Sequence, residues 1–180
     1  KKLQAARILK DLYENDRDFV KRQDVHLTYA DLLLRQGRDS DAKSVLENLI
    51  DEFPHVEAGY LALGRFHADA GRVDEALAVL DRGLSHIRTA PGLRDALAWL
   101  LASHGSGATL ERARHLALEN VLACPDTIDY RATLGYVLLR LGQPASSGAA
   151  LPGNMALQYA ARKQPAPAAG TTIAAATGHF

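Results

Sequence analysis

The chain has 180 residues with 21 acidic and 21 basic side chains, so its formal net charge at pH 7 is zero. It lacks the basic surplus that attracts nucleic acid or an anionic membrane surface, and we predict neither as a partner. Its single cysteine excludes an internal disulfide framework and a thiolate metal cage. No apolar run reaches the roughly 18 residues of a membrane-spanning helix, so no insertion into a membrane is predicted.

The first predicted element is a helix from Leu3 to Tyr13, where apolar residues recur at helical spacing. Small polar residues at positions 15–18 end the pattern. Because no partner helix precedes it, we interpret residues 1–22 as the second helix of a partial repeat. On this interpretation the chain is a fragment of a longer protein.

The next segment predicts a helical hairpin. Its first helix runs from Val25 to Gln36 and ends at Gly37, a residue that adopts left-handed backbone without a Cβ penalty. Its second helix runs from Ala42 to Phe53, and the side chain of Asp39 or Ser40 is expected to cap its first turn. A proline directly after this helix closes the hairpin.

The hairpin pattern recurs along the chain with a period of 34 residues. Residues 23–56 align with residues 57–90 without a gap, and a three-residue insertion in the turn extends the third unit to 91–127. A fourth unit at 128–161 is expected to be degenerate, because glycines and prolines interrupt its second helix. Residues 162–180 are rich in Ala, Gly and Pro and predict either a capping helix or a tail.

Small residues occupy two columns of this alignment. We expect them where two helices approach closely, so that a bulky replacement would overpack the contact. In the first helices they are Ala30, Gly64, Ala98 and Gly135, and in the second helices Ala42, Ala76 and Ala113.

The period and these columns resemble the tetratricopeptide repeat family over residues 1–142. The resemblance implies an all-α fold, a right-handed superhelix (solenoid) of antiparallel helical hairpins. The aromatic residue usual in the first helix of this family is present as Tyr60 and is replaced in the other units by His26, Arg94 and Arg131.

Signals for chemistry are weak in this sequence. The turn from His104 to Thr109 is glycine-rich but lacks the lysine of a phosphate-binding loop, and no strand precedes it. His67 stands at a core column and is expected to be an interior histidine rather than a ligand. We therefore predict no enzyme activity, no catalytic residue, no metal and no cofactor.

The predicted site is a surface, because the first helices of such hairpins line the concave groove of the stack. One column next to the packing positions reads Asp31, Arg65, Trp99 and Tyr136, and the charged residues near it are Asp24, Arg35, Asp69, Asp95 and Arg140. Aromatic residues often anchor interfaces, and an arginine can hold a carboxylate through two hydrogen bonds. The alternative for Trp99 is that it packs against the neighbouring hairpin.

These features predict a scaffold or adaptor that binds an extended peptide or a partner helix in the groove. A second interpretation is the non-catalytic repeat arm of a larger bacterial enzyme or of an exopolysaccharide or secretion machine. A third is self-assembly into a homo-oligomer through the irregular C-terminal end. The sequence is compatible with a cytoplasmic and with a periplasmic location.

Overall fold

The computed structural model describes residues 2–16 and 22–142, and within them all regular structure is helical. This confirms the expected all-α stack of helical hairpins. The rest of the expected fourth unit and residues 162–180 lie outside the described residues. The helices are α1 (Lys2–Asn15), α3 (Gln23–Arg35), α4 (Asp39–Glu52), α5 (Glu57–Asp69), α6 (Val73–His86), α7 (Pro91–His104), α8 (Ala108–Ala123) and α9 (Ile128–Arg140).

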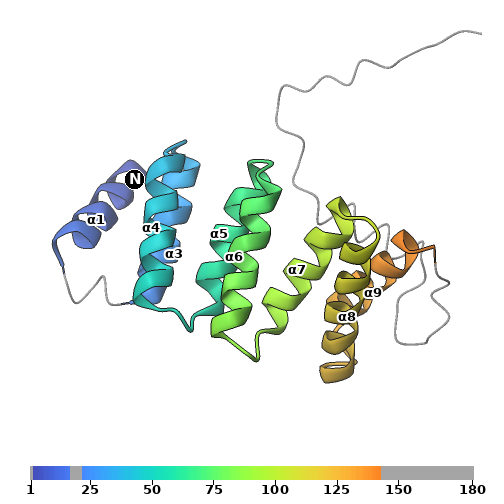
Figure 1. Ribbon diagram of the computed structural model, residues 1–180. Coiled ribbons are helices and arrows are strands. Elements are labelled where there is room, and N and C mark those ends of the chain that lie inside the picture. Colours follow the sequence, from blue (N-terminus) through green and yellow to red (C-terminus); the bar gives the residue numbers. More distant parts are fainter. Residues whose placement is uncertain (1, 17–21, 143–180) are drawn as a thin grey trace, which may run out of the picture.

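Neighbouring helices pack side by side in a row that follows the chain (Figure 1). Helices α3, α5, α7 and α9, here called the A helices, alternate with α4, α6 and α8, here called the B helices. Each A helix packs against the B helix that follows it, and α9 packs against α7 and α8. Helix α1 packs against α3. The arrangement therefore has two layers, with the A helices on one side and the B helices on the other.

Two turns between A and B helices have the same glycine geometry. Gly37 and Gly71 have φ angles of 72° and 73°, the left-handed conformation expected at these positions. The next residue in each turn donates its backbone N–H to a carbonyl in the preceding helix, from Arg38 to Leu33 and from Arg72 to His67. These bonds satisfy the last carbonyls of α3 and α5 and reverse the chain within a few residues.

The expected cap of α4 is wrong. The helix begins at Asp39 itself, its N-cap residue is Arg38, and no side chain accepts a capping hydrogen bond. The reason is that the Gly37 turn starts the helix early, with the N–H of Ala42 bonding to the carbonyl of Arg38 at 3.0 Å. Asp39 then lies in the first turn, where its charge favours the positive end of the helix dipole.

The small residues lie at close helix contacts, as predicted. A Cβ atom on Gly64 would lie 2.9 Å from Cδ2 of Leu80, across the contact between α5 and α6. Ala42 and Ala76 have no exposed surface. Gly83 is enclosed more tightly still, because a Cβ there would meet both Tyr60 of α5 and Leu93 of α7 at 2.8 Å.

The third hairpin replaces the aromatic residue of the second with a polar contact. Tyr60 is fully buried and donates its hydroxyl to the carbonyl of Pro54 at 3.1 Å. At the equivalent position of α7, Arg94 donates from Nε to Oδ1 of Asn120 at 2.9 Å. Asn120 is fully buried and donates to the carbonyl of Pro91 at 2.8 Å. The hydrogen-bonded pair of Arg94 and Asn120 thus takes the place in the third hairpin that Tyr60 and Gly83 have in the second.

Polar contacts also join successive hairpins. A carboxylate oxygen of Glu57, at the start of α5, accepts the backbone N–H of Leu93 at 2.8 Å and so satisfies a free donor in the first turn of α7. On the B helices, Arg82 pairs with Asp51 at 3.0 Å and Arg112 pairs with Asp81. Exposed pairs of this kind each contribute about 0–1 kcal/mol, so they adjust the alignment of the stack more than its stability.

Candidate peptide-binding face

The four residues of the predicted column lie on four successive A helices. Asp31 is on α3, Arg65 on α5, Trp99 on α7 and Tyr136 on α9. Asp31 and Arg65 are exposed, and the two aromatic residues are half-buried. This exposed side of the A helices is called the A face below. Its column changes from charged to aromatic along the stack.

Trp99 and Tyr136 form a stacked pair across two helices. Their ring centroids are 4.7 Å apart and the ring planes differ by 28°. Trp99 therefore does pack against the following A helix, α9, which is the alternative left open by the sequence, yet both rings keep exposed surface. The pair, called the aromatic shelf below, presents a fixed apolar surface on the A face.

The charged residues of α3 and α5 pair along their own helices. Nε of Arg35 donates to Oδ2 of Asp31 at 2.7 Å. The Arg65 guanidinium is 3.5 Å from Asp69 and its side chain is 83% exposed. The longer distance and the high exposure make the second pair the weaker one, so Arg65 is the cation more readily recruited by a ligand.

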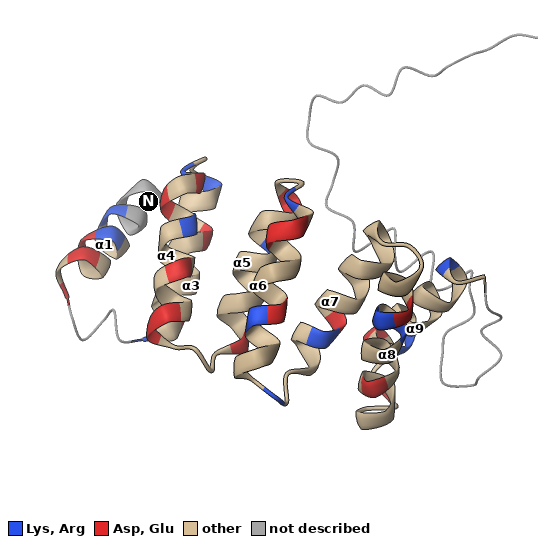
Figure 2. Ribbon diagram, viewed as in Figure 1, with Lys and Arg blue, Asp and Glu red and all other residues tan. Residues whose placement is uncertain are grey.

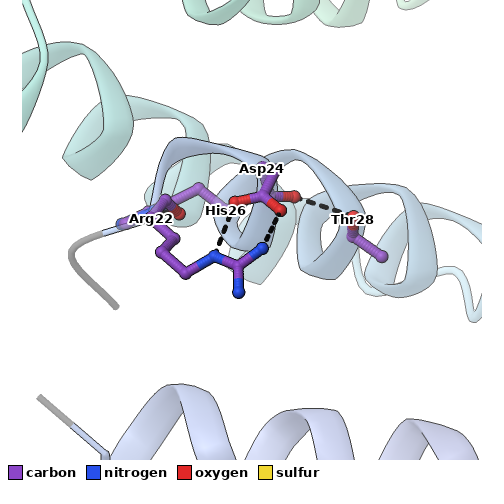
Figure 3. Close-up of polar contacts among 4 residues, drawn as sticks. All are labelled: Arg22, Asp24, His26 and Thr28. Atoms are coloured by element: carbon purple, nitrogen blue, oxygen red, sulfur yellow. Dashed lines mark hydrogen bonds and ion pairs between the residues drawn. The ribbon is translucent and has the colours of Figure 1, made fainter. Parts of the chain in front are cut away.

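Asp24 has a local role at the start of α3 (Figure 3). The guanidinium of Arg22 donates two hydrogen bonds to its carboxylate, at 2.7 and 3.2 Å. The bond from Arg22 lowers the pKa of Asp24 below its usual value. The hydroxyl of Thr28 donates to the Asp24 carbonyl rather than to the carboxylate. Asp24 is thus already occupied by a neighbour in the sequence.

Two of the predicted site residues contribute to the fold. Asp95 is buried, with 7% of its surface exposed. The Arg140 guanidinium of α9 donates to the carbonyls of Ala102, Ser103 and Gly105 at the end of α7. Gly105 has φ −91° in place of the left-handed angle of the earlier turns, so these carbonyls take their donors from another helix.

The role of Arg140 was not predicted, although the sequence carries a signal for it. The three-residue insertion lies in the turn after α7, and this turn lacks the glycine geometry that closes the first two hairpins. Carbonyls at that helix end then need other donors. A basic residue one repeat later, such as Arg140, could have been predicted as the donor for these carbonyls.

His67 is an interior histidine, as predicted. It is 7% exposed, and its Nδ1 accepts a hydrogen bond from Nε of Arg72 at 3.1 Å. Burial, with the nearby Arg72 charge as a smaller cause, lowers the pKa of His67. Within residues 2–16 and 22–142 there is no group of three or more His, Cys, Asp or Glu side chains arranged to hold a metal ion.

Charge on the described surface is mixed. Figure 2 shows acidic and basic positions interspersed along the helices. Among the described helices, none combines the length and the apolar character needed to cross a bilayer. The aromatic shelf is therefore the feature that distinguishes the A face, and it suits contacts with an apolar group.

The fold and this face define a helical-repeat solenoid. Residues 40–100 match the family model for the tetratricopeptide repeat, and this part of the chain is a tetratricopeptide repeat segment. No curated protein sequence matches the chain.

Solved structures show the same fold. MamA (residues 41 to the end) from Desulfovibrio magneticus RS-1 superposes with a TM-score of 0.61 at 16% identity, covering 92% of this chain and 88% of that one. TTC0263, a thermophilic tetratricopeptide repeat protein of Thermus thermophilus, gives 0.59 at 25% identity, covering 75% and 72%. The fold is consistent with a scaffold for protein–protein interaction.

Proposed function

We propose that the protein is a non-catalytic scaffold that binds an extended peptide or a partner helix on the A face. The observation that carries the proposal is the aromatic shelf, where Trp99 and Tyr136 stack at 4.7 Å and stay accessible. Aromatic side chains held rigid by packing lose little entropy on binding, so they are effective anchors.

The charged column supports the same surface. Arg65 lies one repeat before Trp99 in the same register and is 83% exposed. Its partner Asp69 holds it at 3.5 Å, a geometry that a ligand carboxylate can improve. A ligand that crosses successive A helices would then meet a cation and an apolar shelf in turn.

The test is a comparative capture experiment with mass spectrometry. Proteins retained by the wild type should be lost from the double variant Trp99→Ala, Arg65→Ala. They should be retained by Leu122→Ala, which removes an exposed apolar side chain, 74% exposed, from α8 on the other layer. Circular dichroism checks that all variants keep their helical content. Equal capture by the wild type and the double variant would remove the A face as the binding site.

A further inference from the structure

The spacing and chemistry of the A face specify the kind of peptide that fits it. Resting on the function proposed above, we propose that the A face binds a polyproline II peptide. A proline sits on the Trp99–Tyr136 shelf and an acidic residue three positions away pairs with Arg65.

The first argument is the match of two periods. Helix α5 packs against α7, and packed helices lie about 8–10 Å apart. A polyproline II peptide has three residues per turn and rises about 3.1 Å per residue, so its same-face positions repeat at about 9 Å. Every third residue of such a peptide therefore meets the next A helix. A fully extended strand has same-face positions about 7 Å apart and falls out of step with the helices.

The second argument is the chemistry of the shelf. Two stacked aromatic rings, with centroids 4.7 Å apart and planes 28° apart, offer a rigid apolar surface with no charged group of their own. The cation that follows them on α9, Arg140, donates to three carbonyls at the end of α7. A proline ring is apolar and adds little rotamer entropy to the cost of binding, which is how aromatic-lined surfaces select proline-rich segments.

The third argument is charge complementarity at Arg65. Its side chain is 83% exposed, and its contact with Asp69 at 3.5 Å is longer than a charge-assisted hydrogen bond. A peptide carboxylate can approach with two shorter bonds in the bidentate geometry that guanidinium favours. The occupant is thus an acidic, proline-containing peptide rather than a basic one.

The experiment uses the sole tryptophan of the chain as its probe, since Trp99 is itself part of the shelf. The ligand is a capped proline peptide, Pro-Glu-Pro-Pro-Pro-Pro-Pro-Glu-Pro, with a glutamate three residues to either side of the central proline. This symmetry makes the direction of binding irrelevant. Binding to the whole chain is followed by the change in Trp99 fluorescence.

Two matched peptides separate the two contacts. Replacing both glutamates by glutamine should weaken binding about threefold, the effect of an exposed ion pair. Replacing every proline by glycine should weaken it about tenfold or more, because the ligand loses its preformed conformation. Equal binding of the glycine peptide, or of the glutamine peptide, would overturn the proposal.

Protein variants assign the contacts to residues. In Arg65→Gln the ratio of affinities for the glutamate and glutamine peptides should fall to about one, while Tyr136→Ala should abolish the response of Trp99. Leu122→Ala should behave as the wild type. A ratio that persists in Arg65→Gln would overturn the assignment of the acidic contact.

The outcome also separates this inference from the proposed function. If no peptide changes Trp99 fluorescence while captured proteins still depend on Trp99 and Arg65, the A face binds partners and the proline chemistry is wrong. If capture is also independent of both residues, the proposed function fails with it.

Discussion

Replacing Gly83 with alanine tests the packing that holds successive hairpins together. Gly83 lies on α6 between the first helices of two hairpins. A Cβ atom there would lie 2.8 Å from Cγ of Tyr60 and 2.8 Å from Cδ1 of Leu93. Tyr60 and Leu93 are both fully buried, so neither side chain has free space into which to move.

The expected loss follows from two opposing terms. Alanine is favoured over glycine inside a helix by about 1 kcal/mol. Overpacking a filled core costs about 1–3 kcal/mol. Because the new methyl group meets buried atoms on two sides, we expect the upper part of that range and a net loss of about 1–2 kcal/mol.

Gly59 provides the matched control. It is also a helical, buried glycine, but a Cβ there would lie 3.2 Å from Cγ of Leu49 and 3.3 Å from Cγ1 of Ile50. These contacts are tight but less severe, so the propensity gain of about 1 kcal/mol should nearly offset the strain. Gly59→Ala should therefore stay close to the wild type in stability.

The assay is urea unfolding followed by circular dichroism, on the wild type and both alanine variants. A further variant, Leu93→Val, shortens one of the two neighbours of Gly83. The double variant Gly83→Ala, Leu93→Val should lose less stability than the sum of its two single changes. The packing argument is refuted if Gly83→Ala is as stable as the wild type. It is also refuted if Gly59→Ala loses as much.

Three further predictions concern the polar contacts. Asn120→Ala should lower the free energy of unfolding by about 1–3 kcal/mol by leaving Nε of Arg94 without its acceptor. In the Asn120→Ala background, Arg94→Leu should cost less stability than it does in the wild type. Additive losses in urea unfolding would contradict the proposed coupling between Arg94 and Asn120. Glu57→Ala should cost about 1 kcal/mol and speed hydrogen exchange at the Leu93 amide, and an unchanged rate would argue against this cap. Burial lowers the pKa of His67 in the folded state, so below about pH 6.5 this histidine binds protons more readily in the unfolded chain. The free energy of unfolding should therefore decrease as the pH is lowered below about 6.5. His67→Leu should flatten this dependence, and urea unfolding across pH 5–7.5 that matches the wild type would refute it.

The sequence predicted where the residues of the proposed face lie, but not the burial or the contacts of their side chains. The column from Asp31 to Tyr136 followed from the repeat register, because equivalent positions of a solenoid face the same way. The state of each side chain did not follow. Arg65 stays largely exposed, Arg140 is engaged at the end of α7, and Asp95 is buried, although all three were expected on one surface.

By itself the sequence determined the local and periodic features of this protein. The 34-residue period, the glycine turns at Gly37 and Gly71, and the small residues at close contacts all depend on residues near one another in the chain or on register. Each has a direct local cause, such as left-handed backbone or the absence of a Cβ atom. Periodicity then multiplied each signal over several units.

The tertiary structure alone decided which side chains from different repeats meet. Trp99 stacks on Tyr136, Arg94 finds Asn120, and Arg140 caps α7 across sequence separations of 26 to 38 residues. Such contacts depend on the rotation between neighbouring helices, which packing across the whole interface sets and no single residue encodes. The rotation between α7 and α9 brings Trp99 into contact with Tyr136, while Arg65, one repeat earlier in the same column, stays exposed.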